Sequence, residues 1–232
     1  MAKRIGIIGG LSPESTVLYY QHLVRRYHEI FGTHSYPEIL IYSVNFQQYI
    51  AWAYAEAWPA VTEAVLDVLE RLRCAGADFA VIACNTLHVV FDAVQQRSPI
   101  PLLSIIDATA EAIQTAGVDT VGLLGTAFTM EHPFYRDGLA RHGIQALTPP
   151  KARREYIDRI ILDELSLGVI NPATQAAVST IMDELIANGA GGIVLGCTEL
   201  PLLFTDYRNH PLFDTASIHA EKALHYAVGT RV

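Results

Sequence analysis

Cysteine is scarce in this sequence, with three residues among 232. The three are far apart and odd in number, so they form no disulfide framework, and we expect a reducing, cytoplasmic environment. Basic residues are also few: 16 Lys and Arg stand against 24 Asp and Glu, which leaves a formal net charge of −8. Because the chain has no run of basic residues, neither a nucleic-acid surface nor a polybasic membrane patch is expected.

Long apolar runs are missing too. No stretch approaches the roughly 20 residues that a membrane-spanning helix needs. The opening MAKRIGIIGGLSPEST has too short an apolar core for a signal peptide. We therefore expect no membrane partner. What the chain does contain is 51% hydrophobic residues, enough for the core of one large domain or of two small ones.

Short apolar segments alternate with longer segments of helical periodicity, which predicts a parallel α/β architecture. In the first half the expected strands are RIGII, EILIYSV, FAVIA and IPLLSI. The first expected helix follows at 12–30, where Ser12 can cap the helix and Pro13 suits its first turn. Another helix is expected at 59–77, with Gly76 as its stop signal.

The order of segments then repeats. TVGLLGTAFTMEHPFYR resembles RIGIIGGLSPESTVLYY, GAGGIVLGCTEL resembles GADFAVIACNTL, and HPLFDTASIHAEKAL resembles IPLLSIIDATAEAI. Three matches in one order indicate an internal repeat, although buried parallel strands also look alike because all are rich in Val, Ile and Leu. We expect two α/β lobes, 1–104 plus 210–232 and 105–209, with the C-terminal helix near 215–228 packed on the first.

Cys84 and Cys197 occupy matching positions in this repeat, each directly after an expected strand. Ligands of parallel sheets bind beyond the carboxyl ends of the strands, where helix N-termini lower thiol pKa values. In a cleft between the lobes, the two thiols would reach one ligand from opposite sides. This suits inversion at a carbon that bears hydrogen, because one thiolate removes a proton and the opposite thiol returns one. The alternative is a small buried apolar residue, which we expect of Cys74.

No cofactor and no metal are expected. The three lysines, Lys3, Lys151 and Lys222, lie in no recognisable pyridoxal phosphate context. Cys84 and His88 offer one Cys-x3-His pair but Cys197 has no neighbouring His, so metal binding is not indicated. Backbone N–H groups and polar side chains would then have to stabilise the carbanion.

Two turns are candidate carboxylate sites. Gly10 and Thr126 stand in matching turns after the first strand of each half, and Ser12 caps the helix that follows the first turn. N–H groups at such places bind anions. The segment GIIGGLSPEST matches neither the dinucleotide-binding nor the P-loop pattern, so phosphate binding is only weakly indicated. A plain tight turn between strand and helix is the alternative.

Polar residues follow each cysteine. Asn85 and Thr86 come after the first, and Thr198 and Glu199 after the second. We expect these residues to bind the substrate. Glu199 could tune Cys197 or bind an ammonium group, although a carboxylate in a first helical turn is also favoured by the dipole alone. His88 is expected to orient Cys84 or cap its helix rather than to act as the base.

These motifs resemble the aspartate/glutamate racemase family of cofactor-independent amino-acid racemases. The resemblance covers nearly the whole chain and is carried by GIIGGLSPEST, ACNTLH, LLGTAFTM, LGCTEL and PLFDTASIHAE. It implies two flavodoxin-like lobes with pseudo-twofold symmetry, an active site in the cleft between them, and a homodimer. It implies that Cys84 and Cys197 are the two acid/base residues. It also implies substrate contacts by Asn85, Thr86, Thr198 and the turns at Gly10 and Thr126.

The sequence departs from the archetypal family pattern at two places. Gln47 or Gln48, and Ser166, stand where aspartate racemases have an arginine and a lysine. Gln47 is therefore a further candidate substrate ligand, and the pattern is closer to the bacterial subgroup of broad specificity. The first cysteine, which some members of that subgroup lack, is retained here and favours two-base racemisation.

Two alternatives remain open. A maleate isomerase or malonate decarboxylase-like enzyme of the same fold would use one or both cysteines on a different acid. A non-catalytic protein that binds a small acid would only pack its cysteines. The matched cysteine pair favours the racemase, with an amino acid as its small-molecule substrate.

Overall fold

The computed structural model describes residues 2–32, 35–204, 206–208 and 210–229. The chain divides into two units: unit 1 runs to Ile105 and resumes at Ala216, and unit 2 is Ile106–Thr215. The sequence analysis places these crossovers at 104/105 and 209/210. The second crossover lies later in the structure because strand β8 (Leu212–Asp214) pairs with β7 (Gly192–Leu195) and so stays with unit 2.

The centre of unit 1 is a parallel four-stranded sheet of order β2-β1-β3-β4. Its strands are β1 (Ile5–Gly9), β2 (Ile39–Ser43), β3 (Phe79–Ile82) and β4 (Leu102–Leu103). Its helices are α1 (Pro13–Phe31), α2 (Phe46–Tyr54), α3 (Trp58–Cys74), the 3₁₀ turn η1 (Thr86–Val90), α4 (Phe91–Gln95) and α10 (Thr215–Val228).

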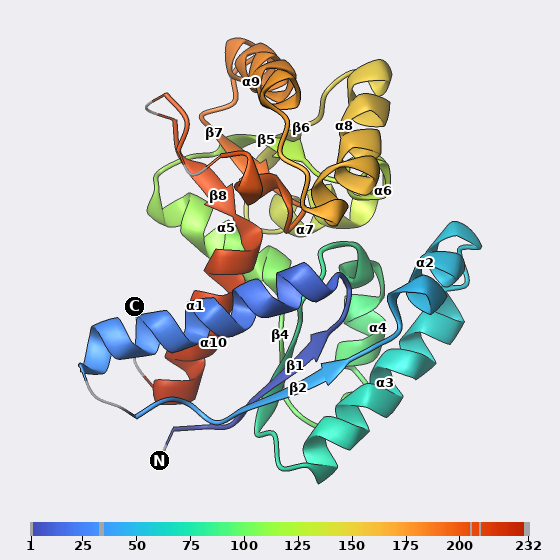
Figure 1. Cartoon of the computed structure of the whole chain (residues 1–232), viewed down its shortest axis with the longest axis vertical. Coiled ribbons are helices and arrows are strands. Elements are labelled where there is room, and N and C mark those ends of the chain that lie inside the picture. The colour runs from blue at the N-terminus through green and yellow to red at the C-terminus, as the bar shows by residue number, and fades with distance from the viewer. Residues whose placement is uncertain (1, 33–34, 205, 209, 230–232) are drawn as a thin grey trace. The chain divides into compact units, whose positions relative to one another are not determined.

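Helices cover both faces of this sheet (Figure 1). Successive residues of β1 point to opposite faces, as strand geometry requires. Ile8 packs in the cluster that contains Val65 and Leu69 of α3, and Ile7 packs with Tyr19 of α1 and Leu224 of α10. Both faces are apolar, which explains why the strands read as continuous apolar runs in the sequence.

Unit 2 repeats this arrangement with a parallel sheet of order β6-β5-β7-β8. Its other strands are β5 (Thr120–Leu124) and β6 (Gln145–Leu147). Its helices are α5 (Ile105–Thr115), α6 (Ala127–Glu131), α7 (Pro133–Ala140), α8 (Lys151–Asp163), the turn η2 (Leu165–Leu167), α9 (Pro172–Ala187) and the turn η3 (Leu200–Leu202). The second strand of each unit stands at the edge and the first lies inside it. The predicted α/β class and its repeated unit are therefore confirmed.

The helix that follows the last strand of each unit belongs to the other unit. The chain leaves unit 1 after β4, so that α5 belongs to unit 2, and it leaves unit 2 after β8, so that α10 belongs to unit 1. In α10, Ala220 and Leu224 are fully buried and pack in one cluster with Ile5 and Phe79. The expectation that the C-terminal helix packs on the first half is confirmed.

Among the described residues, no helix combines the length and hydropathy that a membrane crossing requires. The same residues contain no group of three or more His, Cys, Asp or Glu side chains placed to hold a metal ion.

Candidate active site

Cys84 lies at the carboxyl edge of the unit 1 sheet, two residues beyond the end of β3, and is partly exposed. The chain turns there at once, because the Cys84 N–H donates to the Ile82 carbonyl at 2.8 Å. Asn85 is buried just after this turn, and Thr86 begins η1 with its side chain partly exposed. The three residues that the sequence analysis groups together therefore share one loop.

Gly10 and Ser12 lie in the turn after β1, at the same edge of the sheet. β1 and β3 are neighbours with Ile8 paired to Ile82, so their carboxyl ends lie side by side. Gly10 has a φ of +80°, and a Cβ on it would lie 2.5 Å from the Val44 carbonyl oxygen, so only glycine fits this turn. Its N–H donates to Thr16 Oγ1 at 2.7 Å.

Ser12 caps α1, as the sequence analysis expects. Its Oγ accepts from the Ser15 N–H at 3.4 Å, and Pro13 fills the first helical position. The helix ends where Gly32 adopts the left-handed conformation with φ of 61°. The turn after β1 is thus a helix N-terminus held by its own hydroxyl groups.

Gln47 is the second residue of α2 and is exposed. Its helix follows β2, which lies on the far side of β1 from β3. Ser166 lies in η2 of the other unit, and its hydroxyl donates to the Leu162 carbonyl at 2.7 Å. Neither position places a cation at a strand end.

Cys197 lies at the corresponding edge of unit 2, two residues beyond the end of β7, and its exposure is 9%. Its thiol donates to Glu199 Oε2 at 2.8 Å, and the Thr198 hydroxyl donates to the same oxygen at 3.0 Å. Glu199 itself is 6% exposed. The three residues form a compact buried group in which a carboxylate can accept the proton of a thiol.

Thr126 caps α6 after β5, the neighbour of β7. Its Oγ1 accepts from the Thr129 N–H at 3.3 Å. The chains of the two turns are close, because a Cβ on Gly125 would lie 3.0 Å from the Gly196 carbonyl oxygen. Glycine at both positions therefore lets the Thr126 turn lie against the loop that carries Cys197.

Asp158 of α8 also supports this turn, and sequence reasoning missed it. Its Oδ1 accepts from the Ala127 N–H at 2.8 Å across 31 residues of chain. A carboxylate at a helix start satisfies an N–H group that has no partner within the helix. No local motif marks Asp158, so only the fold reveals this role.

Each of the two like α/β units thus carries a cysteine loop beside a hydroxyl-capped turn. The chain belongs to the Asp/Glu/hydantoin racemase family, whose model matches residues 8–223. This identifies the protein as an enzyme of the racemase class.

Three relatives match this chain over nearly the whole length of both chains. The chain is 25% identical over 228 residues to the broad-specificity amino-acid racemase RacX of Bacillus subtilis, covering 95% of this chain and 96% of that protein. A putative Asp/Glu racemase from Yersinia pestis matches with a TM-score of 0.91 and 38% identity, over 97% of this chain and 99% of that one. An aspartate racemase homologue from Pyrococcus horikoshii matches with a TM-score of 0.87 and 37% identity, over the same shares of the two chains.

Proposed function

We propose that the protein is a cofactor-independent amino-acid racemase in which Cys84 and Cys197 exchange the Cα proton. The observation that carries the proposal is the equivalence of the two cysteines: each lies two residues beyond the third strand of a sheet with the same strand order. One thiolate removes the proton from one face of Cα and becomes a thiol. The opposite thiol gives its proton to the other face of the carbanion and becomes a thiolate, so that the reverse reaction exchanges the two roles.

Glu199 prepares Cys197 for this exchange. Its carboxylate already accepts the thiol hydrogen bond at 2.8 Å, so proton transfer along that bond produces the thiolate that attacks the Cα proton. The Thr198 hydroxyl on the same oxygen offsets part of the cost of burying the carboxylate.

The remaining candidates hold the substrate. We assign the α-carboxylate and α-ammonium groups to the polar atoms of the two cysteine loops and the two capped turns. The residues of this set are Gly10, Ser12, Gln47, Asn85, Thr86, Thr126, Thr198 and Glu199.

We propose a substrate range that extends beyond aspartate and glutamate. Gln47 or Gln48, and Ser166, stand where the resemblance places the arginine and the lysine of archetypal aspartate racemases, so a side-chain carboxylate would lack these cationic partners. The similarity to RacX, a racemase of broad specificity, supports the same proposal. We also propose a homodimer that works in the cytoplasm, where both thiols stay reduced; sedimentation of the purified protein tests the dimer.

Proton exchange in heavy water tests the proposal. The protein is incubated with aspartate, glutamate and a panel of neutral amino acids, and we expect deuterium at Cα together with loss of optical rotation. Cys84→Ser and Cys197→Ser should each abolish racemisation because each removes the proton carrier of one face. Cys74→Ser is the matched control and should retain full activity. The expectation that Cys74 is a small buried residue is wrong, because its side chain is exposed near the end of α3.

Each other outcome decides against the proposal. Substantial two-way racemisation by either single variant would contradict the two-base assignment. Fumarate formed from maleate, without exchange at any amino acid, would favour the isomerase. Binding of small acids without any turnover would favour a non-catalytic protein.

A further inference from the structure

Two buried histidines lie beside the Cys84 loop. His88 of η1 and His219 of α10 are 4% and 0% exposed. Their rings meet edge to face with centroids 6.0 Å apart. His88 also stacks on Phe91, with ring centroids 5.1 Å apart. The His88 ring is thus held on two sides by other rings.

Both nitrogens of His88 are engaged by backbone groups. Nε2 accepts the Ile105 N–H at 3.0 Å, so the ring proton must be on Nδ1. Nδ1 then donates to the Cys84 carbonyl at 2.8 Å. Through these two hydrogen bonds the neutral ring links the Cys84 loop to Ile105. Ile105 is the last residue of unit 1 before the chain enters unit 2.

His219 holds the same backbone segment from the other side. Its Nε2 lies 3.1 Å from the Leu103 carbonyl, which can only accept, so Nε2 carries the proton. Its Nδ1 then accepts from the Tyr19 hydroxyl at 2.9 Å. Leu103 and Ile105 are therefore each tied to one histidine, which makes the segment 103–105 a rigid support for His88.

We propose that His88 is a positioning residue for Cys84: its neutral ring joins the Cys84 carbonyl to the Ile105 N–H and thereby fixes where the thiol lies. This inference rests on the proposed function, in which the Cys84 thiol transfers a proton at Cα. A proton transfer of the proposed kind needs the sulfur at hydrogen-bond reach of Cα, and a misplacement of about 1 Å can cost about 100-fold in rate. The Ile82 carbonyl holds the Cys84 N–H, and the bond of His88 to the Cys84 carbonyl restrains the other side of the same residue.

Three variants separate the two bonds of His88. His88→Asn retains a donor near the position of Nδ1, His88→Gln places its amide near Nε2, and His88→Leu retains neither. All are made in the Cys74→Ser background, so that Cys84 and Cys197 are the remaining thiols. His142→Leu is the matched control, because His142 is a histidine of unit 2 whose ring contacts Asp107.

The first readout is the pH dependence of alkylation by iodoacetamide at each cysteine, followed by mass spectrometry. In His88→Leu and His88→Gln the apparent pKa of Cys84 should differ from that of the parent protein, because the backbone that carries the thiol is no longer held and the thiol's surroundings change. In His88→Asn and His142→Leu it should stay at the value of the parent protein. Cys197 in the same chain is the internal reference and should not change.

The second readout is turnover. His88→Leu should lower kcat about 10- to 100-fold with KM nearly unchanged, and His88→Asn should restore most of it. An unchanged Cys84 in both His88→Leu and His88→Gln would overturn the proposal, as would equal changes at Cys84 and Cys197. If His88→Leu does not fold, the contrast between the Asn and Gln variants decides. Alkylation does not depend on racemisation, so a parent protein without activity would refute the proposed function and leave the test of His88 intact.

Discussion

Cys197 and Glu199 are joined by a direct hydrogen bond in the candidate site. The carboxylate is buried, and a buried charge is costly unless hydrogen bonds satisfy it. The Cys197 thiol and the Thr198 hydroxyl both donate to one of its oxygens. In the proposed mechanism this carboxylate takes the thiol proton, and the arrangement involves three consecutive residues.

At this scale we predict the effect of Glu199→Gln. The amide retains the size of the side chain but cannot take a proton, so kcat should fall about 100-fold, as for the loss of a general base. Alkylation of Cys197 should occur at a lower pH, because the thiol loses the neighbouring carboxylate that favours its protonated form. Initial rates and cysteine alkylation measure the two effects.

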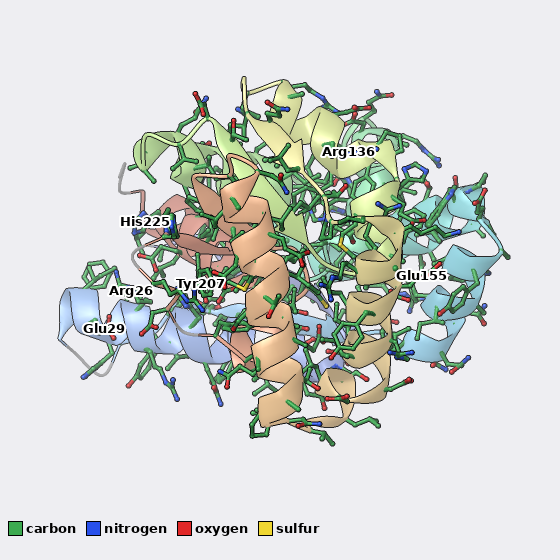
Figure 2. The ribbon with its side chains drawn as sticks, turned by 90° about the horizontal axis from the view of Figure 1, so that it is seen from above. Arg26, Glu29, Arg136, Glu155, Tyr207 and His225 are labelled. Carbon is green, nitrogen blue, oxygen red and sulfur yellow. The ribbon has the colours of Figure 1, made fainter. Side chains whose placement is uncertain are left out.

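Glu155→Gln is the control for this prediction. Glu155 projects from α8 at the surface, with 60% of its side chain exposed (Figure 2). Its replacement should leave both measurements unchanged. Full activity of Glu199→Gln would show that Cys197 is deprotonated by another group.

At the scale of elements, each candidate loop depends on a tight turn between a strand and a helix. After β1 the turn is closed by the Gly10 N–H on Thr16 Oγ1, which itself donates to the Ser12 carbonyl at 3.0 Å. After β5 the turn is closed by Thr126 and by Asp158 of α8. The two turns play equivalent parts, but different residues secure them.

We predict that Gly10→Ala is strongly destabilising. The left-handed conformation costs a residue with a Cβ about 1–2 kcal/mol, and here the added Cβ would also meet the Val44 carbonyl oxygen at 2.5 Å. Gly117→Ala is the matched control, since Gly117 has a φ of +69° but open space around it. Urea denaturation should show a larger loss of unfolding free energy for Gly10→Ala. Equal losses would mean that the backbone near Val44 moves aside without cost.

At the scale of the whole molecule, unit 1 is completed by the last helix of the chain. Leu224 of α10 is fully buried with residues of β1 and β3. Leu224→Ala should therefore destabilise the protein by about 2–5 kcal/mol. Leu167→Ala, at a position with 73% exposure, should change the stability by less than about 0.5 kcal/mol.

Hydrogen exchange localises this effect. In Leu224→Ala the amides of β1 and β3 should lose protection first, since α10 packs on unit 1. An equal first loss in β5 and β7 would contradict the assignment of α10 to unit 1.

Acid should destabilise the molecule through His219. Burial lowers the pKa of this histidine from 6.5 to about 3, and the nearby His88 ring adds to the effect. Between these values the unfolded chain binds a proton that the native protein does not. The free energy of unfolding therefore falls as the pH drops below about 6.5, by about 1.4 kcal/mol per pH unit from this group alone.

His219→Gln tests this assignment. Glutamine does not titrate, so its stability should depend less steeply on pH than that of the parent protein between pH 6 and pH 4. Urea denaturation at several pH values measures the two slopes. Parallel curves would show that other groups cause the acid sensitivity.

Local patterns were sufficient for β1, β3, β5 and β7 and for the positions of the two cysteines, but they did not predict β6, α8 or α9. The strand expected at RIGII is β1 at Ile5–Gly9, and the helix expected at 12–30 is α1 at Pro13–Phe31. Strand periodicity and helix caps depend on residues close together in the chain, and the repeat is visible as an order of similar segments. These features can therefore be recognised in a single sequence. The sequence left the role of Glu199 open, and the structure shows that Glu199 accepts a hydrogen bond from Cys197, two residues away.

Long-range partners could not be predicted. Tyr19 and His219 are 200 residues apart, and His88 and Ile105 are 17 apart. No spacing rule links such residues, because their contacts exist only after sheets and helices have packed. The sequence alone determined the α/β class, the repeated unit and the two cysteine loops, since apolar periodicity and turn residues act locally. Only the tertiary structure decided that Asp158 supports the Thr126 turn and that His219 and His88 bond to the backbone at Leu103 and Ile105, because these contacts join residues of separate elements.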